Sequence, residues 1–315
     1  MHAAKIPFGG GVSPRFTRRL RGQTTAEYVL IIAIIGLVIV FAGPGVAGAI
    51  RNQFNQVTNT VVSGTDGDNF LSAEEKAYRE AMKTVAQKEA KDWSLDEQKA
   101  AATDIAKNGT SSVVYAKAKA AMDAGTTWSV KLTNGKTMAY RIIGINHDNL
   151  ADGSGKGGLT FEATSKDALA SQGMNATYTN VGGWEQSELR QKMNSGEIWN
   201  LMPPEFQSKV KSVTKMTDNK GGGSDGILSA TTDKLFLLST TEIFGDVQTE
   251  GVQYEYYKSK GVSSSNYPEA LAIISHWTRS VDPSNSKVFR IAQGKIGWQN
   301  YGAANPVTVF PAFCF

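Results

Sequence analysis

Residues 128–145, WSVKLTNGKTMAYRIIGI, decide the fold class of this chain. Before this stretch the apolar residues recur at helical spacing, whereas here they alternate with polar residues, as in half-buried β-strands. Asn134-Gly135 separates the two halves, and this dipeptide between alternating runs is a strong signal for a β-hairpin. The stretch therefore predicts two antiparallel strands, at 128–133 and 136–145.

The segments that follow the hairpin predict a mixed α+β domain over residues 128–315. A Gly/Asp-rich loop at 146–158 comes first. The predicted elements are then a strand at 159–163, helices at about 185–195 and 203–211, a buried strand at 234–239, and strands at 271–280, 287–292 and 306–314. Strands at both ends with helices between them are typical of the α+β class.

Three segments before the hairpin predict short helices, at about 72–92, 94–107 and 113–124. Ser72-x-x-Glu75 and Ser94-x-x-Glu97 have the capping-box pattern that begins a helix. Because these segments carry many charges and few large apolar residues, we expect residues 64–127 to form a helical stalk or a small cap.

An acidic segment at 66–75, DGDNFLSAEE, has part of the pattern of an EF-hand calcium loop. Asp66, Asp68 and Glu75 are the candidate ligands. The pattern departs from the calcium loop at the first ligand position, Gly64, and at the turn position, Asn69. An ordinary acidic helix N-terminus explains the same residues, and no other metal site and no cofactor is expected.

Residues 28–50, YVLIIAIIGLVIVFAGPGVAGAI, form an uncharged run between Glu27 and Arg51. About 20 such residues cross the hydrocarbon core of a bilayer, so the run predicts one transmembrane helix in contact with membrane lipid. Five basic residues and no acid lie in the first 22 residues. By the positive-inside rule they place the N-terminus in the cytoplasm and the large domain outside the cell. A secretory signal peptide is the alternative.

The net charge of +4 does not indicate a nucleic-acid partner. Outside the first 22 residues, 28 basic residues stand against 29 acidic ones, so the excess of positive charge belongs to the N-terminal segment. A basic surface of the kind that binds nucleic acid is therefore not expected.

The residues before the apolar run, RGQTTAEY at 21–28, resemble the processing site of type IV pilins. The Glu-Tyr pair resembles the Flp, or tight-adherence, class of type IVb pilins. In that family a prepilin peptidase cuts after the glycine and the apolar helix is retained. The resemblance implies cleavage between Gly22 and Gln23, a leader at 1–22 and a pilin-type transmembrane helix at 23–63.

Glu27 is the residue that the resemblance and elementary electrostatics both single out. An ionisable group at the edge of a bilayer is costly unless it is paired. After cleavage, the new amine of Gln23 on a neighbouring subunit is a suitable cation, and the pair would set the stagger between packed helices. Snorkelling of Glu27 to the headgroups, with Tyr28 as an interfacial aromatic, is the alternative. The pairing implies other pilin subunits and the pilus assembly machinery as partners.

The C-terminal part resembles a domain of uncharacterised function that recurs in surface proteins of Gram-positive bacteria, over about residues 130–315. The matching motifs include Gly182-Gly183-Trp184, Asp233 to Glu242, Trp277-x-Arg279-Ser280 and Pro311-x-Phe313. The Trp-x-Arg-Ser block also resembles C-type-lectin-like and formylglycine-enzyme-like domains. These resemblances imply a loop-rich α+β module for display or binding, without implying an activity.

The sequence does not predict a catalytic site, so the chain is not expected to be an enzyme. His147-Asp148 lies in a loop without a nucleophile motif, and such a pair is usually part of a turn. His276 is expected to be a packing histidine, and Cys314, the one cysteine, an inert core thiol.

Aromatic residues in loop-like sequence are the candidate ligand contacts, with Trp184 and Trp277 assigned to the core. The candidates are Tyr254, Tyr256, Tyr257, Trp298 and Tyr301, which we expect to be exposed to a glycan or a protein surface. The sequence thus predicts a Flp/type IVb pilin-like cell-surface subunit that displays an adhesion or binding domain as a minor or tip component. The alternative is a single-pass membrane-anchored binding protein outside any fibre.

Overall fold

The structure is a computed structural model that describes residues 73–223, 226–245, 250–268, 271, 274–294 and 297–315. The chain divides into two compact units, residues 1–65 and 66–315, and the described residues all belong to the second. Within the described ranges no helix combines the length and the apolar character needed to cross a membrane. The predicted transmembrane run and the four residues Gly22, Gln23, Glu27 and Tyr28 lie outside these ranges.

The described unit is built on a five-stranded antiparallel sheet of strand order β1-β2-β3-β10-β6. Its strands are β1 (Thr127–Lys131), β2 (Thr137–Ile145), β3 (Leu159–Ala163), β6 (Leu235–Phe236) and β10 (Ala312–Cys314). The predicted hairpin is confirmed, because β1 pairs with β2 around Asn134-Gly135. Gly135 has φ +82°, a conformation that glycine adopts without steric cost.

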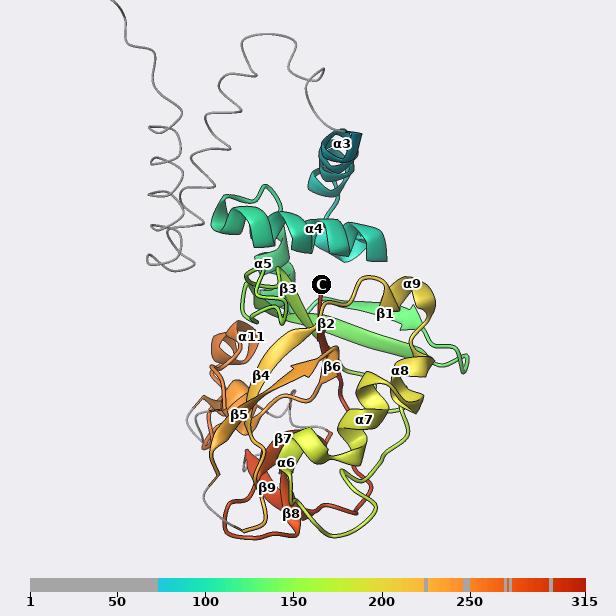
Figure 1. The fold of residues 1–315 in the computed structure, drawn as a ribbon. Helices are drawn as coiled ribbons and strands as arrows, with labels where there is room; N and C mark the ends of the chain where they lie inside the picture. Colours follow the sequence, from blue (N-terminus) through green and yellow to red (C-terminus); the bar gives the residue numbers. More distant parts are fainter. Residues whose placement is uncertain (1–72, 224–225, 246–249, 269–270, 272–273, 295–296) are drawn as a thin grey trace, which may run out of the picture. The chain divides into compact units, whose positions relative to one another are not determined.

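Two smaller antiparallel sheets complete the unit (Figure 1). One pairs β4 (Val213–Asp218) with β5 (Leu228–Asp233), and the other contains β7 (His276–Val281), β8 (Val288–Ala292) and β9 (Trp298–Gly302). The predicted strands at 271–280 and 287–292 correspond to β7 and β8. The predicted strands at 234–239 and 306–314 shorten to β6 and β10, and the sequence did not predict β4, β5 or β9.

Short helices connect the sheets. They are α6 (Gly183–Gln186), α7 (Glu188–Asn194), α8 (Glu197–Leu201), α9 (Pro204–Gln207), α10 (Thr240–Phe244) and α11 (Glu255–Ser259). The helix expected at 185–195 is split between α6 and α7, because the Ser187 side chain caps a new helix by accepting from Arg190 N. The helix expected at 203–211 is only the single turn of α9.

The three predicted N-terminal helices are present as α3 (Ala73–Gln87), α4 (Leu95–Asn108) and α5 (Tyr115–Ala124). The Ser94 capping box is also confirmed, since its side chain accepts from Glu97 N and the Glu97 side chain accepts from Ser94 N. Short 3₁₀ turns at Ala90–Asp92 and Gly109–Ser111 join the helices.

These helices share one hydrophobic core with the main sheet, whereas the sequence favoured a stalk or a small cap over a part of the core. Ala102 and Ile105 of α4 are fully buried in that core. Two long-range hydrogen bonds tie the region to the hairpin: Trp128 Nε1 donates to Ala90 O at 3.0 Å, and Tyr140 OH donates to Gln98 Oε1 at 3.1 Å. Alanine-rich helices can pack closely on a sheet because their side chains are small, so few large apolar residues are needed for burial.

Edge-to-face aromatic rings fill the core beneath the sheet. Tyr140 contacts Phe161 and Phe313 with ring centroids 5.5 and 5.3 Å apart. Trp184 and Trp277 are buried, as expected. Cys314 is also buried, so its predicted place in the core is confirmed, and burial raises the pKa of its thiol to about 12. The described unit is therefore of the mixed α+β class.

Candidate functional site

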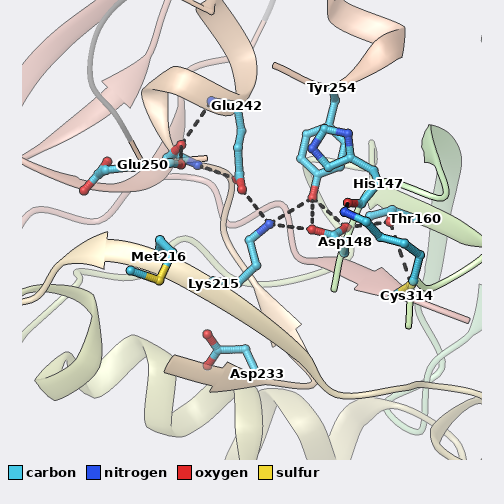
Figure 2. A network of polar contacts seen from close by, with 12 residues as sticks. His147, Asp148, Thr160, Lys215, Met216, Asp233, Glu242, Glu250, Tyr254 and Cys314 are labelled. Carbon is cyan, nitrogen blue, oxygen red and sulfur yellow. Dashed lines mark hydrogen bonds and ion pairs between the residues drawn. The ribbon is translucent and has the colours of Figure 1, made fainter. Parts of the chain in front are cut away.

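A network of buried charged residues lies where the loop after β2, strand β4, strand β7 and helix α10 meet (Figure 2). At its centre Lys215 Nζ lies 2.7 Å from Asp148 Oδ1 and 2.5 Å from Glu242 Oε1. Lys215, Asp148 and Glu242 are only 3%, 4% and 1% exposed. Burial of charge is costly unless the charges are paired, so these contacts are needed for the fold.

Asp148 is held by hydroxyl groups as well as by Lys215. Thr160 Oγ1 donates to Asp148 Oδ2 at 2.6 Å, and Tyr254 OH lies 2.8 Å from the same oxygen. Burial alone would raise the pKa of Asp148, but the neighbouring charges of Lys215 and His147 outweigh it and lower this pKa to about 2. Asp148 is therefore ionised in the folded chain.

Arg279 of β7 forms the second half of the network. Its guanidinium makes a bidentate ion pair with Glu242, with Nη2 3.0 Å from Oε1, and its Nε donates to Thr217 Oγ1 at 2.7 Å. Glu250 lies beside the pair, accepts from Ser280 Oγ and from Asp218 N, and has a pKa that burial raises. At the centre, Lys215 and Arg279 thus contact the carboxyl groups of Asp148 and Glu242.

The interpretation of His147-Asp148 as part of a turn is only half right. The pair lies in a loop, but the Asp148 side chain is buried in the network. The His147 ring stacks on Tyr254 with centroids 4.0 Å apart and lies 3.1 Å from Glu255 Oε1. Burial lowers the pKa of His147, but the carboxylates of Glu255, Asp148 and Glu242 together outweigh burial and the net pKa is raised.

The expectation that Tyr254, Tyr256 and Tyr257 are exposed is wrong. They are 0%, 4% and 1% exposed, because α11 packs on β2 and turns these rings into the core. Two of their hydroxyls bind buried carboxylates, Tyr254 to Asp148 and Tyr257 to Glu162. The other candidates lie on β9: Trp298 is half-buried with Arg290 over its ring, and Tyr301 is exposed.

A cavity of about 220 Å³ opens beside α11. Its lining includes Arg141, Glu162, Tyr257, Tyr267, His276 and Phe310. Arg141 Nη2 is 3.2 Å from Glu162 Oε2, and the Arg141 guanidinium lies over the Tyr256 ring at 4.3 Å. The cavity therefore combines aromatic walls with a balanced ion pair, which suits an uncharged ligand with polar groups.

His276 of the cavity wall has one ring nitrogen bonded and one unpaired. Its Nδ1 lies 3.0 Å from Ile274 O and must donate, since a carbonyl oxygen only accepts. Burial lowers the pKa of His276, which keeps the ring neutral. Its buried Nε2 is then an acceptor without a partner in the described part of the chain. The packing role predicted for His276 is confirmed, and the unpaired acceptor is the feature that the sequence did not indicate.

The cavity adjoins a wider hollow of about 950 Å³, with which it shares the wall residues Thr164 and Ile274. Most of the other residues that line that hollow have polar side chains. Its lining includes Lys136, Thr137, Ser165, Lys166, Asp167, Ser275 and Thr308. A ligand larger than the inner cavity would therefore extend over polar side chains.

The buried state of His276 leads to a pH-dependent stability. The pKa of His276 is lower in the folded chain than its ordinary value of 6.5. At pH values between these two pKa values, His276 binds a proton in the unfolded chain but not in the folded chain. The contribution of neutral His276 to the free energy of unfolding is therefore fully present above its ordinary pKa. It is lost as the pH falls from that value toward the lowered pKa of the folded chain. We expect a shift from about pH 7.5 to about pH 5.5 to destabilise the wild-type chain more than His276→Gln.

Chemical denaturation of both chains at the two pH values measures this difference. Other groups, including His147 with its raised pKa, contribute equally to both chains and cancel in the comparison. Equal losses of stability in the two chains would contradict the assignment.

Among the described residues no group of three His, Cys, Asp or Glu side chains is arranged to hold a metal ion. Of the calcium candidates, Glu75 lies in α3 with its Oε1 3.5 Å from Arg79 Nε. Asp66 and Asp68 lie outside the described ranges.

Residues 163–315 match the protein family described as "Domain of unknown function (DUF6273)". The match contains Lys215, Glu242 and Arg279 of the buried network and His276 of the cavity, whereas Asp148 and Glu162 precede it. No curated protein and no solved structure matches the chain.

Proposed function

We propose that this chain is a Flp/type IVb pilin-like precursor, processed by a prepilin peptidase after Gly22, that displays its α+β unit outside the cell. The observation that carries the proposal is the order of features at the N-terminus: a basic leader, Gly22, then Glu27-Tyr28 at the head of an uncharged run. A basic leader and a run of this length favour membrane insertion with the following domain outside.

Glu27 would act in assembly. Its carboxylate would pair with the amine that cleavage creates on Gln23 of a neighbouring subunit, and the helices would pack with a fixed stagger. The large α+β unit supports a minor or tip position better than a position repeated along a shaft, because pilins of this class are little more than the helix.

The role of the displayed unit is proposed to be adhesion or binding rather than catalysis. The cavity beside α11 supports this role with aromatic walls, the Arg141–Glu162 pair and the unpaired Nε2 of His276. The finer proposal, that the unit is C-type-lectin-like, rests on the Trp277-x-Arg279-Ser280 block and the closing strand.

Processing tests the proposal directly. When the full chain is co-expressed with a prepilin peptidase, we expect N-terminal sequencing of the product to begin at Gln23. Gly22→Ala should abolish cleavage, because the resemblance places the glycine directly before the cut bond.

Gly11→Ala is the matched control, since it makes the same change elsewhere in the leader, and its cleavage should be normal. A wild-type product that still begins at Met1, or that begins after Ala49, would overturn the proposal. The second outcome would indicate a secretory signal peptide.

A further inference from the structure

Lys215, Asp148 and Glu242 bring an amine and two carboxylates into direct contact inside the protein. Lys215 Nζ is 2.7 Å from one Asp148 oxygen and 2.5 Å from a Glu242 oxygen. Figure 2 shows Lys215 reaching between the two acids, which come from the loop after β2 and from α10. Groups held in contact in one geometry react as if present at a very high concentration.

Lys215 Nζ lies among buried aromatic rings. Lys215 Nζ lies 4.5 Å from the centre of the Phe236 ring and 5.3 Å from that of Tyr254, and both rings are fully buried. Asp148 is ionised, so the reaction starts from the ion pair, and the low dielectric around the pair favours a product without charges.

We propose that Lys215 and Asp148 condense to form an intramolecular amide bond, with Glu242 as the proton carrier. In the first step one proton moves from Lys215 Nζ to the Asp148 carboxylate, which gives a neutral amine and a carboxylic acid. The amine lone pair then attacks Asp148 Cγ and the C–N bond forms.

Glu242 carries the second proton of the reaction. It takes a second proton from Lys215 Nζ and passes it to the departing hydroxyl, so that one C–O bond of Asp148 breaks and water leaves. The third proton stays on the amide nitrogen, and Glu242 returns to its carboxylate form. The step needs no oxidant, reductant or other co-reactant.

The hydroxyls around Asp148 suit this reaction. Tyr254 OH is 3.0 and 2.8 Å from the two carboxyl oxygens, and Thr160 Oγ1 is 2.6 Å from Oδ2. Donors fixed at these positions stabilise the negative charge that develops on oxygen during the attack. They also hold the carboxyl group still beside Lys215.

The charge balance of the network is kept after condensation. One buried ion pair disappears, and Glu242 remains paired with Arg279. The new bond joins positions 67 residues apart and restricts the unfolded chain, as a disulfide would. The chain has a single cysteine and so forms no disulfide within itself.

The intact mass of the purified full chain under denaturing conditions tests the proposal. The reference is the mass calculated from the sequence that starts at the measured N-terminal residue. We expect the measured mass to be lower than this reference by one water molecule. Tryptic digestion should release one branched peptide that contains both Lys215 and Asp148. The full sequence mass with only linear peptides would overturn the proposal, and a branched peptide that joins Lys215 to Glu242 would overturn the choice of Asp148.

Matched variants separate the reaction from simple proximity. Lys215→Arg, which keeps the charge, and Glu242→Gln should both have the full mass of their sequences. Lys119→Arg is the control, because Lys119 Nζ is 2.5 Å from Asp123 Oδ2 but this pair is exposed. It should retain the loss of one water. The result does not depend on processing, since the mass difference is measured equally well on the Gly22→Ala chain.

Discussion

Replacement of Arg279 with methionine is expected to lower the free energy of unfolding by about 3–5 kcal/mol. Arg279 is fully buried and forms the bidentate pair with Glu242. Its guanidinium also donates to Thr217 Oγ1 and to the carbonyl oxygens of Leu237 and Met216. Methionine fills much of the same volume, so the loss comes from acceptors left without donors inside the protein.

Denaturation of the full chain with guanidinium chloride, in detergent micelles, measures this loss of unfolding free energy. Lys83→Met is the matched control, because Lys83 pairs with Glu80 at 3.1 Å while their side chains are 71% and 74% exposed. Exposed pairs contribute about 0–1 kcal/mol. If the two variants lose similar stability, the buried network does not have the structural role assigned to it.

Gly158→Ala is expected to destabilise the protein by about 3 kcal/mol, at the upper end of the cost of overpacking. A Cβ atom at this position would lie 1.8 Å from the carbonyl oxygen of Ala102 and 2.5 Å from its carbonyl carbon. These are backbone atoms of α4, so a change of rotamer does not relieve the clash. Helix α4 would have to move away from the start of β3, with loss of contacts in the shared core.

Gly153→Ala is the control for the change of residue type. Gly153 has φ +73°, and a Cβ atom there would meet no atom within 4 Å. Its cost is therefore backbone strain alone, about 1–2 kcal/mol. Equal losses in the two variants would show that α4 is not held against the sheet and would favour the separate helical stalk.

Local signals in the sequence correctly predicted the elements that depend on neighbouring residues. Asn134-Gly135 specifies a tight turn, because glycine alone adopts the required positive φ without cost. Ser94 and Glu97 begin α4 by bonding to each other's backbone. The apolar residues of 159–163 predict strand β3, although not the burial of its Thr160 and Glu162. Each of these signals operates within a few residues, so tertiary contacts did not alter them.

The strands β4, β5 and β9 were missed for a physical reason. Their sequences, VTKMTD, LSATTD and WQNYG, are largely polar and lack a clear apolar face. A polar strand forms where partners satisfy its backbone and its buried side chains. In β4 the residues concerned are Lys215 and Thr217, whose partners are Asp148, Glu242 and Arg279.

The burial of Tyr254, which precedes α11, and of Tyr257 within it was also missed from the sequence. Tyr254 and Tyr257 occur in polar sequence, which is typical of a surface loop, yet their hydroxyls bind the buried carboxylates of Asp148 and Glu162. An amphipathic side chain can serve in the core or at the surface, and only its partner decides which.

The sequence by itself determined the α+β class, the central hairpin, the start of α4 and the pilin-like pattern on which the proposed function depends. The buried network and the cavity were decided only by tertiary structure. Asp148, Lys215, Glu242 and Arg279 come from four separate segments, and no sequence pattern indicates that their side chains meet. Charged residues are ordinarily taken as exposed, and these are buried because folding brings opposite charges within hydrogen-bonding distance, where mutual attraction offsets the loss of water.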